Sequence, residues 1–196
     1  MRSLFPLSIH EIKVRNFKII KEDVTSYIHS ERKRDKKGVV KSNKRGWQSQ
    51  PILPGEPNIL IDTVLKEVVD YFSIEKIFKE NVGLKITNLW INVNPKGAYN
   101  KYHTHPHSHL SGVWWIKTPK NCGELWFSNH QAFDRYAELE SYSEGFKEST
   151  STYLDYYLEP QEGGMVVFPS FLTHHVAENE SNQERISVSF NIDLRP

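Results

Sequence analysis

Apolar residues in the first third of the chain recur at the spacing of amphipathic helices. They fall every three or four positions in two segments, one with Phe17, Ile20, Val24, Tyr27 and Ile28, the other with Ile61, Leu65, Val68, Val69 and Phe72. This period places the apolar side chains on one face of a helix. We therefore expect helices over residues 16–30 and 58–72, preceded by a strand over residues 7–14, where the alternation is weak.

From residue 84 onward the pattern changes to short runs of β-branched and aromatic residues, separated by Pro, Gly and Asn. The six runs are residues 84–93, 111–117, 123–128, 151–158, 164–170 and 185–193. With no helical period after Phe72, such a series is typical of an antiparallel sandwich or barrel. We expect one domain over residues 1–196, in which a helical part, residues 1–83, packs against a β core, residues 84–196.

The composition is that of an ordinary globular protein, with 38% hydrophobic and 25% charged residues. A net charge of +1 gives no overall reason to expect a nucleic acid or an anionic membrane as partner. No apolar run approaches the ~18 residues of a membrane span, and charges interrupt the N-terminal apolar patch, unlike in a signal peptide. Because Cys122 is the single cysteine, no disulfide forms within the chain, and we expect a cytoplasmic protein.

One segment departs from this neutral balance. Residues 31–46 read ERKRDKKGVVKSNKRG and hold eight Lys or Arg in sixteen positions. Such a run is typical of a solvated loop. Binding of an acidic partner or a nucleic acid through residues 32–45 is the alternative.

Four of the nine histidines lie within seven positions, at residues 103, 105, 107 and 109. In an extended chain, residues two apart project to the same face, and Pro106 restricts His105 to an extended conformation. His103 and His105 are therefore candidates to share one metal ion. The alternative is a histidine-rich surface tract that binds metals only adventitiously.

The last predicted strand carries polar residues where a core strand should be apolar on both faces. Arg185, Ser187, Ser189 and Asn191 alternate with Ile186, Val188, Phe190 and Ile192, and His174 precedes Arg185 by eleven positions. Burying this polar face is costly unless the groups meet partners. The tail carboxylate of 2-oxoglutarate would satisfy Arg185 and Ser187. An arginine at a barrel rim, paired with a glutamate, is the alternative.

Together these pieces resemble a known family. The sequence H-x-H-P at residues 103–106, followed by SGVWWI, FPSFLTHHV and RISVSFN, is similar to 2-oxoglutarate/Fe(II) oxygenases related to prolyl hydroxylases, a group with phage and bacterial members. SNKRGWQSQPIL, residues 42–53, resembles an N-terminal motif of the same group. The resemblance covers about residues 42–194. It implies a mainly β fold, a double-stranded β-helix (jelly roll) with the N-terminal helices packed on it.

The resemblance also implies a metal-binding role for three histidines. His103 matches the first iron ligand of the family, and His174 matches the distal ligand because Val176 follows it two positions later. The usual carboxylate is missing, since no Asp or Glu occurs between Ile91 and Gly123. We therefore expect His105 as the third ligand. His107 and His109 are competing candidates, but the role expected for them is polar lining of the mouth, and His175 is expected near the ligands or at the surface.

Further positions are expected to contribute to the site, some by the same resemblance and others by their residue types. Arg185 and Ser187 are expected to bind 2-oxoglutarate, and Trp115 lies where relatives have a tyrosine that contacts it. Gln48 and Ser49 are expected either to reach the site or to form a turn or cap. Residues 129–152 are expected to form a lid or substrate wall. Trp90, Trp114, Trp115 and Trp126 are candidates for an apolar pocket wall, although core packing explains most tryptophans.

The function implied is that of a 2-oxoglutarate- and Fe(II)-dependent dioxygenase, a hydroxylase that oxidises a substrate C–H bond with O₂ and releases succinate and CO₂. No catalytic residue beyond the metal ligands is expected. A peptide side chain, a nucleobase and a metabolite all stay open as substrates. Two alternatives remain: a cupin-type dioxygenase with three histidines and no 2-oxoglutarate, and a non-catalytic jelly-roll binding or structural module.

Overall fold

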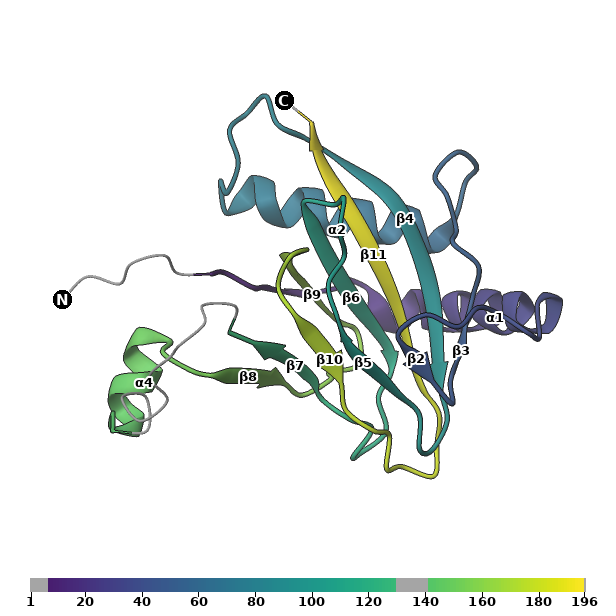
Figure 1. Cartoon of the computed structure of the whole chain (residues 1–196). Coiled ribbons are helices and arrows are strands. Elements are labelled where there is room, and N and C mark those ends of the chain that lie inside the picture. Colours follow the sequence, from purple (N-terminus) through teal and green to yellow (C-terminus); the bar gives the residue numbers. More distant parts are fainter. Residues whose placement is uncertain (1–6, 130–140, 196) are drawn as a thin grey trace.

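Two antiparallel sheets form the body of the protein in the computed structural model, which describes residues 7–129 and 141–195 (Figure 1). The larger sheet has the order β1 (His10–Lys13), β9 (Gly164–Pro169), β6 (Leu110–Lys117), β11 (Arg185–Arg195), β4 (Gly83–Asn94), β3 (Trp47–Gln48). The smaller has the order β2 (Asn43–Lys44), β5 (Tyr99–His103), β10 (His174–Val176), β7 (Leu125–Ser128), β8 (Asp155–Leu158). This two-sheet arrangement confirms the mainly β, jelly-roll prediction.

Two helices cover the outer face of the larger sheet, α1 (Phe17–Arg34) and α2 (Ile59–Ile74) (Figure 1). The N-cap of α2 is Asn58, whose side chain accepts hydrogen bonds from two backbone N–H groups of the first turn. The main core lies between helices and sheet, and includes Val24, Ile28, Leu60, Val64, Ile186, Val188 and Phe190. Both helices were predicted, and α1 extends further than expected, through Arg34.

A second core lies between the two sheets. It consists of Trp115, Leu125, Phe127, Leu158, Val166, Phe168 and Leu172. Along β11 the apolar residues pack toward the helices, while Arg185, Ser187 and Ser189 face the space between the sheets. The predicted alternation of this strand is thus confirmed, and it delivers polar groups to the inside of the fold.

Three parts of the fold differ from the sequence-based expectation. A short helix, α4 (Glu144–Thr150), follows the capping side chain of Ser143, so the expectation of no helix after Phe72 is wrong. Of the predicted run 151–158, only residues 155–158 form a strand. The short strands β5 and β10 were not predicted, because polar residues interrupt any apolar alternation there. Of the expected lid, residues 130–140 lie outside the described residues.

The basic segment is only in part a loop. Arg32, Lys33 and Arg34 form the last turn of α1, where positive charge suits the helix dipole, and Arg32 pairs with Glu184. Farther on, β2 pairs with β5.

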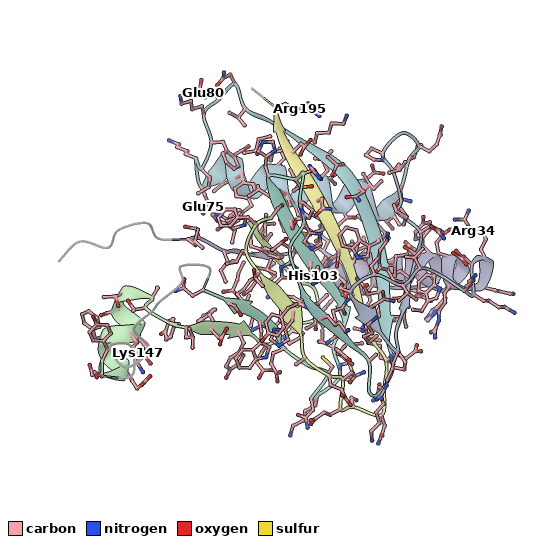
Figure 2. All side chains as sticks on the ribbon, viewed as in Figure 1. Arg34, Glu75, Glu80, His103, Lys147 and Arg195 are labelled. Atoms are coloured by element: carbon pink, nitrogen blue, oxygen red, sulfur yellow. The ribbon has the colours of Figure 1, made fainter. Side chains whose placement is uncertain are left out.

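In the view of Figure 2, the labelled charged side chains of Arg34, Glu80 and Lys147 lie at the rim of the molecule, whereas His103 lies near its centre. Within the described ranges, no helix is long and apolar enough to cross a membrane.

Candidate metal and cosubstrate site

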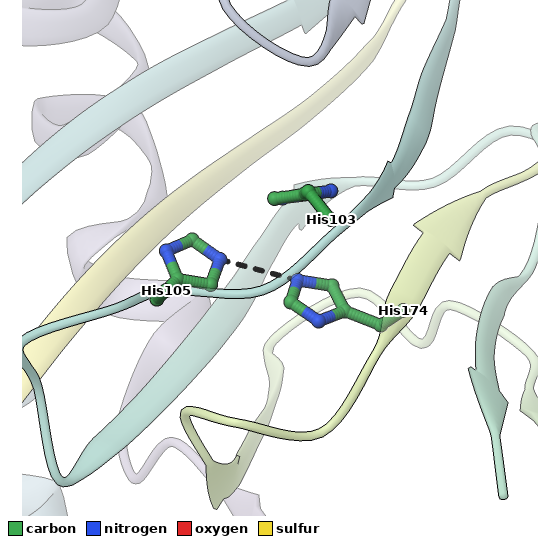
Figure 3. Close-up of side chains that lie close together, drawn as sticks. All are labelled: His103, His105 and His174. Atoms are coloured by element: carbon green, nitrogen blue, oxygen red, sulfur yellow. Dashed lines mark hydrogen bonds between the residues drawn. The ribbon is translucent and has the colours of Figure 1, made fainter. Parts of the chain in front are cut away.

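Three histidines from two neighbouring segments converge between the sheets (Figure 3). His103 ends β5, His174 begins β10, and the two residues are direct partners in the antiparallel register. His105 follows β5 by two positions. One ring nitrogen from each histidine lies within 4.8 Å of the others, and the Nε2 atoms of His105 and His174 are 3.2 Å apart. This is a cluster that could hold a metal ion.

Backbone carbonyls fix the orientation of two of the rings. Nδ1 of His103 lies 2.7 Å from the carbonyl oxygen of Lys101, and Nδ1 of His174 lies 2.8 Å from that of Leu172. A carbonyl only accepts, so each Nδ1 carries the proton and donates it. The Nε2 lone pairs are left free to face the cluster, which is how metal-binding histidines are commonly held.

Burial keeps these rings neutral. It lowers the pKa of His174 to about 3 and, together with the nearby His103, the pKa of His105 to about 4. The pKa of His103 is also lowered by burial. All three rings are therefore in the unprotonated form that binds metals at neutral pH.

The contacts that position His105 in the cluster differ from those expected. Strand β5 ends at His103, so strand alternation does not position His105. Instead its backbone N–H donates to the carbonyl of Ser170 at 2.9 Å, and its ring stacks on Trp90 with centroids 5.4 Å apart.

The remaining histidines of the region lie apart from the cluster. His107 has a φ of 70°, which turns the chain immediately after Pro106. His109 is exposed and lies 3.3 Å from a carboxylate oxygen of Asp193. His175 projects to the opposite face of β10, where it packs on Tyr102.

A cavity extends from the histidines toward the start of β11. Its wall is formed by Ser42, Trp90, Asn92, Asn100, His103, His105, Gly112, Val113, Trp115, Leu125, Phe168, His174, Val176, Arg185, Ser187 and Ser189. The expected cosubstrate residues Arg185, Ser187 and Trp115 therefore share one cavity with the three histidines. Of the candidate tryptophans, Trp90 and Trp115 line it, while Trp114 belongs to the core under the helices.

Arg185 is a buried cation without a carboxylate partner among the residues that the structure describes. Its side chain is 2% exposed, and one terminal nitrogen donates to the carbonyls of Cys122 and Gly123 at 2.7 and 3.1 Å. Burial lowers its pKa to about 10, so the guanidinium stays charged at neutral pH. The alternative of a rim arginine paired with glutamate is therefore wrong. A buried charge of this kind favours an anionic ligand in the cavity.

Of the two roles expected for Gln48 and Ser49, reaching the site is not what the structure shows, because neither residue lines the cavity. The Ser49 hydroxyl accepts from the backbone of Ile91 and donates to that of Gln50, so it holds the edge strand rather than reaching the site. Gln48 is likewise absent from the cavity wall. Ser42 is the residue that reaches it, with its hydroxyl 3.5 Å from Nε2 of His103. Sequence reasoning missed Ser42 because its position depends on the pairing of β2 with β5.

The donor set fits Fe(II). Imidazole is a good ligand for this ion, and three neutral rings, two of them oriented by backbone carbonyls, leave the cavity side of the cluster to other ligands. A model of the family described as "Putative 2OG-Fe(II) oxygenase" matches residues 88–191, more than half of the chain. The chain belongs to this family. It is thus a 2-oxoglutarate-dependent non-haem iron oxygenase whose cofactors are Fe(II) and 2-oxoglutarate.

Solved structures show the same fold at low sequence identity. A prolyl-4-hydroxylase from Pseudomonas putida is 15% identical, with a TM-score of 0.63 over 97% of this chain and 94% of its own. The viral collagen prolyl hydroxylase of Paramecium bursaria Chlorella virus-1, in complex with 2-oxoglutarate, is 14% identical, with a TM-score of 0.58 and 94% of each chain covered. HygX from Streptomyces hygroscopicus, with nickel and 2-oxoglutarate bound, is 9% identical, with a TM-score of 0.61 over 95% of this chain and 83% of its own. Among curated proteins no sequence relative matches the chain.

Proposed function

We propose that the protein is a hydroxylase that holds Fe(II) with His103, His105 and His174 and anchors 2-oxoglutarate with Arg185 and Ser187. The observation that carries this proposal is the shared cavity, with three neutral histidines at one part of its wall and, at another, a buried guanidinium that has no carboxylate partner among the described residues. When bound, the iron and cosubstrate supply oxidation of a substrate C–H bond by O₂ with release of succinate and CO₂.

The residues of the chain bind, orient and exclude water. Two carbonyls hold one nitrogen of the Arg185 guanidinium, which fixes its plane and leaves its other N–H groups for a carboxylate. Ser187 lies two positions along the same face of β11 and adds a hydroxyl to the wall. Trp115, 5% exposed, forms an apolar part of that wall and keeps water from the carboxylate.

The substrate enters from the histidine end, because the Arg185 end lies deep between the sheets. A peptide side chain, a nucleobase and a metabolite are the classes we propose, with O₂ as co-reactant and the cytoplasm as location. One similar structure is a prolyl hydroxylase from Trichoplax adhaerens in complex with a peptide fragment, and another is HygX with hygromycin B bound, so proteins of this fold bind both peptides and small molecules.

Anaerobic spectroscopy tests the proposal. Addition of 2-oxoglutarate to the Fe(II)-loaded protein is expected to give the visible charge-transfer band of a chelated 2-oxo acid, and admission of O₂ is expected to release succinate. The matched control is a variant with all three histidines replaced by alanine, which should give neither signal. A parent protein that binds Fe(II) but shows no band with 2-oxoglutarate would contradict the proposed site.

A further inference from the structure

Among the described residues, one fully buried side-chain atom of the cavity wall has no hydrogen-bond partner. Oδ1 of Asn92 is buried and unpaired, and the side chain as a whole is 6% exposed. Three other buried side-chain atoms of the described residues are also unpaired, but they belong to Asn94, Trp114 and His175, which do not line the cavity. A buried acceptor without a partner is costly, so the arrangement around Asn92 is incomplete until a further group enters.

The register of the larger sheet places Asn92 between the two ends of the site. Asn92 lies opposite Ser187 on β11, whereas its neighbours on the same face, Trp90 and Asn94, lie opposite Ser189 and Arg185. Trp90 stacks on His105. Asn92 therefore borders the stretch of cavity between the histidine cluster and the guanidinium, which is the stretch that an anchored 2-oxo acid spans.

The hydrogen bond that Asn92 does make can be reversed. Its Nδ2 donates to the Ser189 hydroxyl at 3.0 Å, and Oδ1 is the atom of this cavity-lining side chain that has no partner. A hydroxyl both donates and accepts, and a side-chain amide exchanges its oxygen and nitrogen by a half turn. In the reversed arrangement Ser189 donates to Oδ1, and Nδ2 is free to donate into the cavity.

The chemistry of the cosubstrate selects between the two arrangements. At neutral pH 2-oxoglutarate offers two carboxylates and a ketone, all acceptors, so an inward Oδ1 would repel it and an inward Nδ2 would bind it. We infer that Asn92 is a cosubstrate-binding residue, which donates from Nδ2 to an oxygen of 2-oxoglutarate while Ser189 holds its Oδ1. This inference rests on the proposed function, and it gives a partner to the one buried side-chain atom that lacks one among the described residues of the cavity wall.

Calorimetric titration of 2-oxoglutarate into the anaerobic Fe(II)-loaded protein tests the assignment. Asn92→Ala is expected to raise the dissociation constant roughly ten- to a hundred-fold, the effect of one hydrogen bond to a charged group. Asn92→Asp is expected to raise it further, because a carboxylate of nearly the same shape only accepts and repels the dianion. Ser189→Ala should have a smaller effect than Asn92→Ala, because Nδ2 still donates.

Two controls separate this role from a structural one. Asn88→Ala removes an amide of the same strand that lies outside the cavity and binds Asn191, and it should leave the dissociation constant unchanged. Fe(II) affinity should be unchanged in every variant. If Asn92→Ala and Asn92→Asp lower the melting temperature but bind 2-oxoglutarate as tightly as the parent, Asn92 has a structural role only and the inference is overturned. Failure of the proposed function looks different, because the parent itself would then not bind 2-oxoglutarate.

Discussion

His105 and His174 point their Nε2 atoms at each other across 3.2 Å, with ring planes only 7° apart. Two ligand nitrogens at right angles on one first-row ion, each at about 2.1 Å, would lie about 3 Å apart. Since Nδ1 of His174 donates to a carbonyl, its Nε2 lone pair is available to an ion, and Nε2 of His105 faces the same point. The two rings are thus placed as adjacent ligands of one ion, and this supports the proposal that His105 is a ligand.

The first prediction concerns His105. His105→Ala should remove one ligand and lower Fe(II) affinity by at least ten-fold, because metal ligation depends on the number of donors. His105→Asp should retain measurable iron binding, since a carboxylate is also a ligand for this ion. Fluorescence competition with a chelator of known affinity measures both, and a structure of the metal-loaded protein should show Fe–N distances of about 2.0–2.2 Å.

Neighbouring histidines provide the matched controls for that experiment. His107→Ala and His109→Ala should bind Fe(II) as the parent does, because the turn at His107 and the contact of His109 with Asp193 hold both rings away from the cluster. If His107→Ala lost as much Fe(II) affinity as His105→Ala, the assignment of His105 as the third ligand would be wrong.

The sequence predicted this site unevenly, for physical reasons. Arg185 and Ser187 were predicted to share a face because the side chains of every second residue of a long strand project to the same side of the sheet. Spacing alone also paired His103 with His105, although stacking on Trp90, not strand geometry, positions the second ring. Ser42 and Asn92 were missed because their place in the cavity depends on strand pairing across distant segments.

Arg185 is the subject of the second prediction. Arg185→Lys should weaken 2-oxoglutarate binding by at least ten-fold while leaving Fe(II) affinity unchanged, because lysine keeps the charge but lacks the planar fork that grips a carboxylate. Arg185→Ala should weaken binding more and also destabilise the fold, since it leaves the carbonyls of Cys122 and Gly123 without their donor. Calorimetry with thermal unfolding on the same samples separates the two effects. Unchanged cosubstrate affinity in both variants would remove Arg185 from the site.

The third prediction concerns pH. A histidine in an unfolded chain has a pKa of about 6.5, whereas burial lowers the pKa of His174 to about 3 and that of His105 to about 4. As the pH falls below 6.5 the unfolded chain therefore binds protons that the folded chain does not. The contribution of these two histidines to the free energy of unfolding is therefore fully present above pH 6.5. It declines as the pH falls toward their folded-state pKa values, and the loss for His174 is about 1 kcal/mol at pH 5.5.

Urea unfolding of the metal-free protein at pH 7.5 and pH 5.5 measures this loss. The variant His174→Gln should lose about 1 kcal/mol less than the parent between the two pH values, because it has one fewer group to protonate on unfolding. An identical loss in parent and variant would show that His174 does not contribute.

The basic segment gives a fourth prediction, which the structure divides in two. Lys36 and Lys37 are exposed, so replacing both with alanine should leave uncoupled 2-oxoglutarate turnover as in the parent.

Asn43 is 3% exposed and holds the segment together through the carbonyls of Val39 and Gly46. Asn43→Ala should cost about 1–3 kcal/mol and release Ser42 from the cavity wall. Thermal unfolding and succinate release measure the two outcomes, and lost turnover in a folded Lys36, Lys37 double variant would place those lysines in the site.

The last prediction concerns Gly112, which lies on β6 where the strand is packed between β9 and β11. A Cβ at this position would lie 2.2 Å from the Phe190 ring and 2.7 Å from the backbone carbonyl of Val166. The ring has no free space, since Phe190 is fully buried, and the carbonyl belongs to a paired strand. Gly112→Ala should therefore destabilise the protein by about 2–3 kcal/mol, which lowers the melting temperature by roughly 5–10 °C for a chain of this size.

Gly83→Ala is the matched control for Gly112→Ala, because it makes the same change in a strand where the nearest atom is 3.8 Å away. It should shift the melting temperature by less than about 2 °C. Equal melting temperatures for the two variants would mean that β6 does not pack against Phe190 as closely as described.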